Sequence, residues 1–144
     1  MKTIPVKCMV RVRPLSSKEE AEGAQKCVVA VANQLAIRDN QFTFDCVFPP
    51  TVDQVEVFAR TVEPMVVRLF EGFNQTVFAY GQTGSGKTFT MGGEYGKQIN
   101  KDIEGIIPRV TTKIFETIES LTDTYKVAAK VSYFELYKVN FEIF

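Results

Sequence analysis

The feature that most constrains this chain is a glycine-rich run from Gly81 to Thr88, which reads GQTGSGKT. The run fits the pattern G-x-x-x-x-G-K-[ST]. Residues 76–80, ahead of it, are β-branched and aromatic, which predicts a buried strand. Residues 88–91, behind it, can open a helix before two glycines interrupt. Strand, glycine loop and helix in this order form the context in which the pattern binds phosphate, so we expect such a unit here.

The expected chemistry follows from the loop's backbone. Successive N–H groups of such a loop converge on phosphate oxygens and form an anion-binding concavity. The start of the following helix adds further N–H donors and the positive end of its dipole. Glycine suits positions where a Cβ would block the approach of the backbone or forbid a positive φ. The residues expected to hold a nucleoside triphosphate are Gly81, Gln82, Thr83, Gly84, Ser85, Gly86, Lys87 and Thr88.

Two side chains of the run are expected to contact the phosphates and the accompanying metal ion. The ammonium of Lys87 is expected near the β- and γ-phosphates, and the hydroxyl of Thr88 is expected to ligate Mg²⁺. The alternative is a glycine-rich turn that matches by chance, which average residue frequencies give in under about 1% of chains of this length.

Length and composition predict a globular protein of one domain. The chain has 144 residues, enough for one domain, with 45% hydrophobic and 24% charged residues, as in ordinary globular proteins. The 17 acidic and 17 basic residues cancel, so we expect no nucleic-acid partner and no anionic membrane partner. No apolar run approaches the roughly 20 residues of a membrane span, and the N-terminus lacks the apolar core of a signal peptide. These features predict a cytosolic location.

Histidine and cysteine usage excludes other chemistries. The chain has no histidine, which largely excludes Ser–His, Cys–His and zinc-dependent catalysis. Cys8, Cys27 and Cys46 are odd in number and widely spaced, which argues against a disulfide framework or a zinc site. All three lie in apolar, strand-like segments, so we expect buried, inert thiols.

Hydrophobic periodicity predicts alternating strands and helices, and therefore an α/β sheet with helices on its faces. A charged surface turn is expected at 18–23, a hairpin around Asn33 and Gln34, and an irregular polar loop at 92–104. The segments expected to form strands are 6–12, 27–31, 35–37, 41–48 and 126–137.

Two helices are expected. The first is capped by Thr51 or Asp53, ends at Gly72, and is kinked or divided by Pro64. Its apolar face comprises Val55, Phe58, Ala59, Val62, Val66, Leu69 and Phe70. The second spans 107–121, and its apolar face comprises Ile107, Val110, Thr111, Ile114, Phe115, Ile118 and Leu121, with Pro108 in its first turn.

The glycine run and three other stretches resemble the kinesin motor domain. Residues 73–88, FNQTVFAYGQTGSGKT, look like its nucleotide-binding signature. Residues 10–14, VRVRP, resemble the R-x-R-P segment that lines the adenine pocket. Residues 105–109, GIIPR, and 131–137, VSYFELY, resemble a later helix start and strand of the family. The resemblance covers residues 5–138.

The resemblance implies a fold, a ligand and a partner. It implies a three-layer, P-loop NTPase-like mixed sheet with helices on both faces, incomplete at its C-terminal side. It also implies ATP and Mg²⁺ as cofactors, microtubules as partner, and a place on the cytoskeleton of the cytoplasm. Residues 1–138 would be the N-terminal part of the motor domain, and 139–144 a divergent end.

The resemblance further implies that Arg11, Arg13 and Pro14 bind adenine. A planar guanidinium stacks on an aromatic base, and a rigid proline ring packs beside it. Strand alternation would put both arginines on one side. Two solvent-facing arginines on an edge strand are the alternative. Phe89 could pack under the base or face the core.

The match to the family stops in two places. The N-x-x-S-S-R-S-H and D-L-A-G-S-E segments, which sense the γ-phosphate and position the attacking water in kinesins, do not occur in these residues. Residues 138–144, KVNFEIF, replace the polar run that ends D-L-L in the family, which suggests a truncated, alternatively spliced or mispredicted product. We expect the chain alone to be poorly soluble or partly folded.

Three functional hypotheses stay open at this point. The first is the ATP-binding part of a microtubule motor, an ATP-hydrolysing enzyme when complete, with no catalytic residue assignable here. The second is a non-catalytic nucleotide-binding module or decoy. The third, a different P-loop enzyme, has no support outside the glycine run.

Overall fold

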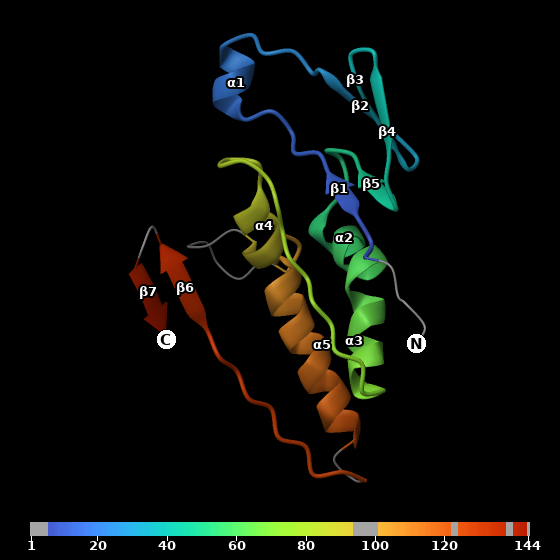
Figure 1. Cartoon of the computed structure of the whole chain (residues 1–144), viewed down its shortest axis with the longest axis vertical. Coiled ribbons are helices and arrows are strands. Elements are labelled where there is room, and N and C mark those ends of the chain that lie inside the picture. Colours follow the sequence, from blue (N-terminus) through green and yellow to red (C-terminus); the bar gives the residue numbers. More distant parts are fainter. Residues whose placement is uncertain (1–5, 94–100, 122–123, 138–139, 144) are drawn as a thin grey trace.

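The strands of this chain lie in three separate small sheets. The structure, a computed structural model, describes residues 6–93, 101–121, 124–137 and 140–143 (Figure 1). The parallel pair β1–β5 and the antiparallel sheets β2–β3–β4 and β6–β7 hold all strands in this described part. The strands are β1 (Met9–Arg11), β2 (Val28–Val31), β3 (Gln34–Ile37), β4 (Asn40–Thr43), β5 (Cys46–Phe48), β6 (Phe134–Tyr137) and β7 (Asn140–Ile143).

Five helices complete the described part of the chain. They are α1 (Ser17–Ala21), α2 (Gln54–Thr61), α3 (Glu63–Phe70), α4 (Lys87–Gly92) and α5 (Ile106–Leu121). Helices α3 and α5 lie side by side, and α4 contacts α5 close to its N-terminus (Figure 1). The chain is therefore of mixed α/β character, but a single three-layer sheet with helices on both faces is not formed by the residues described.

Two apolar clusters hold the elements together. The first joins α2 and α3 to the start of α5 and contains Phe58, Val62, Val66 and Ile106. The second packs α2 against the β1–β5 pair and contains Cys46, Phe48 and Val57. Because α2 contributes to both clusters, it fixes the parallel strand pair relative to the helices.

The first predicted helix is confirmed, with its cap and its division. Asp53 accepts a hydrogen bond from the backbone N–H of Glu56 at 2.7 Å, so Asp53 is the N-cap. The helix divides at Val62, and Pro64 lies in the first turn of α3, where its missing N–H is tolerated. Gly72 follows with a φ of 89°.

The predicted apolar face of this helix is only partly right. Phe58, Val62 and Val66 are buried, but Val57 is buried in place of Val55 because α2 also faces the β1–β5 pair. The other exposed members of the predicted face are Ala59, Leu69 and Phe70.

The second predicted helix is confirmed as α5, but its predicted apolar face is also only partly right. Ile106, one residue before the predicted start, is its one buried side chain. Val110 and Ile114 are half-buried and pack on the first cluster. Ile107 and Phe115 are exposed instead, because, within the described residues, α5 is covered along the side that faces α2, α3 and α4.

The strand predicted at 76–80 is wrong. These residues form no strand, and Phe78 and Tyr80 are 74% and 96% exposed. A strand needs a neighbour to pair its backbone groups, and no neighbouring strand is available to this segment within the described ranges. The strand predicted at 126–137 is likewise confirmed only at 134–137, as β6.

The remaining strand predictions are confirmed with changed bounds: 27–31 shortens to β2, and 35–37 extends by one residue to β3. The hairpin is β2–β3, with its turn at Ala32 and Asn33. The predicted strand 6–12 contracts to β1. The predicted strand 41–48 divides into β4 and β5, because Asp45 leaves the antiparallel sheet and bonds with Cys8 through both its backbone N–H and its carboxylate.

Two further predictions are corrected. The charged surface turn at 18–23 is largely the exposed helix α1, which begins with a capping box between Ser16 and Glu19. Of the three cysteines, Cys46 is buried, but Cys8 and Cys27 are exposed because each lies just ahead of its short strand. The predicted loop at 92–104 falls partly outside the described residues.

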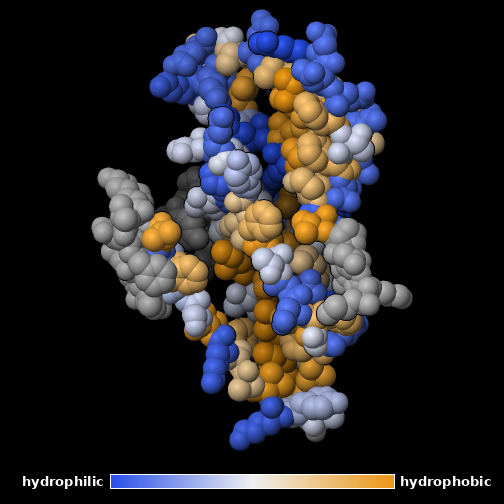
Figure 2. Space-filling view, viewed as in Figure 1, coloured by the Kyte–Doolittle hydropathy of each residue, from blue (hydrophilic) through white to orange (hydrophobic). Residues whose placement is uncertain are grey.

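Much apolar surface stays uncovered. Apolar residues, orange in Figure 2, spread over the region of α3 and α5. The exposed apolar side chains include Val67, Leu69, Phe70, Phe73, Ile107 and Phe115. Over the residues described, no helix has both the length and the apolar character that crossing a membrane requires.

Candidate nucleotide-binding site

The glycine run forms a tight loop that leads directly into α4. The backbone N–H of Ser85 donates to the carbonyl of Gln82 at 3.1 Å, which closes a turn within the loop. Gly84 and Gly86 have φ values of 78° and 97°, in the left-handed region that favours glycine. Gly86 is the N-cap of α4, and its carbonyl accepts from the N–H of Thr90 at 2.9 Å.

The first glycine of the run is required for a different reason. Its φ is 153°, and a Cβ built on Gly81 would lie 2.5 Å from the hydroxyl oxygen of Ser85. Real Cβ atoms essentially never lie this close to another atom, so a larger residue would force the Ser85 side chain to move and would also have to adopt a φ that favours glycine. The glycine pattern therefore encodes the observed backbone.

Lys87 turns back over the loop that precedes it. Its Nζ donates to the carbonyl of Gly81 at 2.8 Å and to the carbonyl of Gln82 at 2.9 Å. The ammonium is thus held at the loop, where its charge attracts an anion. Thr88 follows in the first turn of α4, with an exposed side chain.

Two distant parts of the sequence meet at one open cavity of about 300 Å³. Arg11 and Arg13 line one side, and residues 82–85 line the other. This volume lies at the lower end of the range for small-molecule sites. The predicted base-binding and phosphate-binding residues are therefore neighbours in space. Pro14, Lys87 and Thr88 are not among the residues that line the cavity.

Arg11 is anchored in the interior. Its Nη1 donates to Gln54 Oε1 at 2.6 Å and to Thr90 Oγ1 at 3.2 Å, and its Nη2 donates to the carbonyl of Val52 at 3.3 Å. Its guanidinium carbon lies 5.3 Å from the centre of the Phe89 ring. Burial lowers the pKa of Arg11, which the carboxylate of Asp53 opposes.

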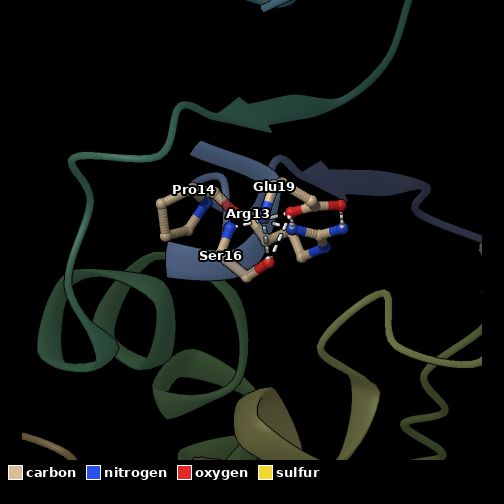
Figure 3. A network of polar contacts seen from close by, with 4 residues as sticks. All are labelled: Arg13, Pro14, Ser16 and Glu19. Atoms are coloured by element: carbon tan, nitrogen blue, oxygen red, sulfur yellow. Dashed lines mark hydrogen bonds and ion pairs between the residues drawn. The ribbon is translucent and has the colours of Figure 1, made fainter. Parts of the chain in front are cut away.

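Arg13 makes a different set of contacts, shown in Figure 3. Its Nη2 and Nη1 each donate to one carboxylate oxygen of Glu19 at 2.6 Å, and Nη1 also donates to the carbonyl of Pro14 at 2.9 Å. The same carboxylate accepts from the backbone N–H of Ser16 at 2.7 Å. The hydrogen bonds from Arg13, followed by those from Ser16, lower the pKa of Glu19 to about 2.

The sequence analysis missed two side chains of this region. Gln54, 4% exposed, accepts from Arg11 and donates through Nε2 to the carbonyl of Phe89 at 2.7 Å. No local signal marks it, because its partners are remote in the sequence. Glu19 does have a signal: Ser16 and Glu19 fit the S-x-x-E pattern of a capping box.

Comparison with known proteins places the chain in a family. The family model of the kinesin motor domain matches residues 11–142. The chain is 45% identical over 141 residues to the chromosome-associated kinesin KIF4B of Homo sapiens, covering 95% of this chain and 11% of that protein. It is 46% identical over 142 residues to the kinesin-like protein KIF27 of Mus musculus, covering 96% of this chain and 10% of that protein.

The chain belongs to the kinesin motor domain family. The P-loop NTPase-like α/β fold is the fold of this family, and the mixed helices and strands described above agree with it. The chain spans about a tenth of the length of the curated relatives it matches.

Proposed function

We propose that this chain is the ATP-binding part of a microtubule motor. Residues 81–88 hold the triphosphate, and the Thr88 hydroxyl is a ligand of the accompanying Mg²⁺. Arg11, Arg13 and Pro14 form the adenine side. In the whole protein, ATP hydrolysis drives movement along microtubules, on the cytoskeleton of the cytoplasm.

The observation that carries this proposal is the shared cavity. A phosphate loop alone accounts for a triphosphate, but here the loop faces one space together with Arg11, at the end of β1, and Arg13, just after it. The left-handed glycines and the ammonium of Lys87 suit close approach of an anion. The metal, when bound, neutralises the charge that develops on the phosphates.

The groups present in these residues can bind nucleotide but do not include those that hydrolysis also needs. Residues 81–88 supply binding and charge, whereas hydrolysis also requires groups that orient the attacking water. The two segments that do so in kinesins are absent from these 144 residues. A nucleotide-binding module without turnover of its own is therefore the second candidate. The main microtubule contacts of the family also lie in residues other than these.

The substitution Lys87→Ala tests the site. It removes the ammonium while leaving the glycines, so affinity for Mg–ATP should fall by about tenfold or more, the value of a charge-assisted hydrogen bond. Lys18→Ala is the matched control, because Lys18 is exposed on α1 and forms a long ion pair with Glu22, at 3.9 Å. Equal affinity for Mg–ATP in wild type and Lys87→Ala, measured by calorimetry, contradicts the assignment.

Turnover separates the two candidate functions. Steady-state ATPase activity is measured with and without microtubules, both for residues 1–144 and for the whole protein. We expect stimulation by microtubules in the whole protein only. Stimulated turnover by residues 1–144 would show that they suffice for catalysis.

A further inference from the structure

Glu19 holds one edge of the Arg13 guanidinium through both carboxylate oxygens. The two carboxylate oxygens accept from Nη1 and Nη2 at 2.6 Å each, a bidentate pair that matches two planar groups edge to edge (Figure 3). Such a pair fixes the plane of the guanidinium as well as its position.

Glu19 is itself fixed by the start of α1. Its carboxylate accepts from the backbone N–H of Ser16 at 2.7 Å and from the Ser16 hydroxyl at 2.9 Å. Its own backbone N–H donates to that hydroxyl at 3.3 Å, which completes the capping box. Arg13 is therefore tied to a folded helix turn and not to another mobile side chain.

The Arg13–Glu19 pair limits which interactions Arg13 can make with a ligand in the cavity that it lines. Its charge is balanced by Glu19, so it is a weak counter-charge for phosphate. Three of its five N–H donors are taken up by Glu19 and the carbonyl of Pro14, and the flat face of the half-exposed guanidinium can receive an aromatic ring. Arg11 differs, because its guanidinium is held by Gln54 and already faces the ring of Phe89.

We propose that Glu19 is a positioning residue for base recognition: it orients the guanidinium of Arg13 so that its face receives the nucleobase. The inference rests on the proposed function, because it concerns the base end of the same nucleotide. Ordering Arg13 before the ligand arrives also spares the entropy of fixing a long side chain upon binding.

The test separates the base from the phosphates with two probes, Mg–ATP and magnesium tripolyphosphate. Glu19→Gln keeps a side chain that can close the capping box but removes the charge and the second acceptor. We expect the ratio of ATP affinity to tripolyphosphate affinity to fall about tenfold. Tripolyphosphate affinity should hold or rise, because the charge of Arg13 is released.

Three further single variants and one double variant, made in the complete protein, isolate the pair. Glu20→Gln removes a neighbouring charge and should keep the wild-type ratio. Ser16→Ala removes one of the bonds that fix Glu19 but leaves its bond to the Ser16 backbone N–H and both Arg13–Glu19 bonds, so it should lower the ratio less than Glu19→Gln does. Arg13→Lys keeps the charge without the flat face and should lower the ratio as Glu19→Gln does. The double variant Arg13→Lys with Glu19→Gln should fall no further than either single one. Far-UV circular dichroism confirms that each variant is folded.

The outcomes distinguish the two proposals. If the wild type binds Mg–ATP and Glu19→Gln keeps its ratio, the positioning role is wrong and the site stands. If Ser16→Ala lowers the ratio as much as Glu19→Gln, the stability of α1 and not the pair is responsible, and the inference fails. If the wild type binds no ATP, the proposed function fails, and this inference with it.

Discussion

The guanidinium of Arg11 donates to the side-chain oxygen of Gln54 across 2.6 Å, and this contact joins β1 to the start of α2. The amide nitrogen of the same Gln54 donates to the carbonyls of Phe89, in α4, and Ile103, at 2.7 Å and 3.4 Å. One buried amide thus ties β1, the strand that ends at Arg11, to the helix that follows the glycine loop. The relative position of the two sides of the cavity depends on it.

Replacing Gln54 by alanine should therefore loosen the site and the fold together. The change removes the bond that Gln54 accepts from the half-buried guanidinium, worth about 1.5–3 kcal/mol, and the bond that it donates to the carbonyl of Phe89, worth about 0.5–1.5 kcal/mol. Both groups keep other partners, because Arg11 still donates to Thr90 and Val52 and the carbonyl still accepts from the N–H of Gly93. Urea denaturation should show a corresponding loss in the free energy of unfolding. Gln41→Ala is the control, because Gln41 bonds to Gln34 at an exposed position. Equal losses in the two variants would contradict the central role of Gln54.

A second prediction concerns the close approach of two chain segments at the end of α4. A Cβ on Gly105 would lie 2.5 Å from the carbonyl carbon of Met91 and 2.6 Å from the backbone nitrogens of Gly92 and Gly93. Backbone atoms cannot move aside as a flexible side chain can, so Gly105→Ala must displace the start of α5. We expect a lower melting temperature and weaker nucleotide binding.

Gly72→Ala is the matched control for this steric effect. Gly72 has a φ of 89° but nothing within 4 Å of a built Cβ, so alanine there meets only backbone strain of about 1 kcal/mol. Gly105→Ala should lower the melting temperature more than Gly72→Ala does, as measured by circular dichroism. A smaller effect at Gly105 would show that the two segments separate readily.

A third prediction concerns the cluster between α3 and α5. Val66 is 4% exposed and packs with Phe58, Val62 and Ile106, whereas its neighbour Val67 is 55% exposed. Val66→Ala should lower the free energy of unfolding by about 2 kcal/mol through lost burial. Val67→Ala should change it by less than about 0.5 kcal/mol. If denaturant midpoints shift equally, the cluster is not the core.

A fourth prediction concerns pH. The pKa of Glu19 is lowered from 4.5 to about 2, so this group binds a proton less readily in the folded chain than in the unfolded one. Its contribution to stability is therefore complete above about pH 4.5 and is lost as the pH falls towards 2. The difference in stability between wild type and Glu19→Gln should persist from pH 7 to pH 5 and shrink below pH 4. A difference that changes near pH 6 would point to another group.

Local signals in the sequence predict the local parts of this structure. The glycines at 84 and 86 encode positive φ values, Asp53 marks a helix start and Pro64 marks a break, and each acts within a few residues. The capping box at Ser16 was equally local, so α1 could have been predicted from the same rules.

The predictions that fail depend on remote partners. A β-branched and aromatic run at 76–80 favours a strand, but only a neighbouring strand can pair its backbone. The role of Gln54 is hidden for the same reason, because its partners lie 43, 35 and 49 residues away in the sequence. The meeting of the arginines with the glycine loop was expected from family resemblance, not from periodicity. The contacts and distances at this cavity could be read only from the structure.

The last prediction concerns residues 1–144 on their own. Phe78, Tyr80 and Val131 lie outside the strands and are mostly exposed, and exposed apolar segments of this kind favour association between chains. We expect the purified chain to bind apolar dyes, to self-associate, and to lack a cooperative thermal transition above about 45 °C, an ordinary value for mesophile domains. Phe78→Ser should reduce self-association without lowering stability, unlike Val66→Ala, because no packed contact is lost. A soluble monomer with a sharp transition above this temperature would mean that these segments are covered in solution.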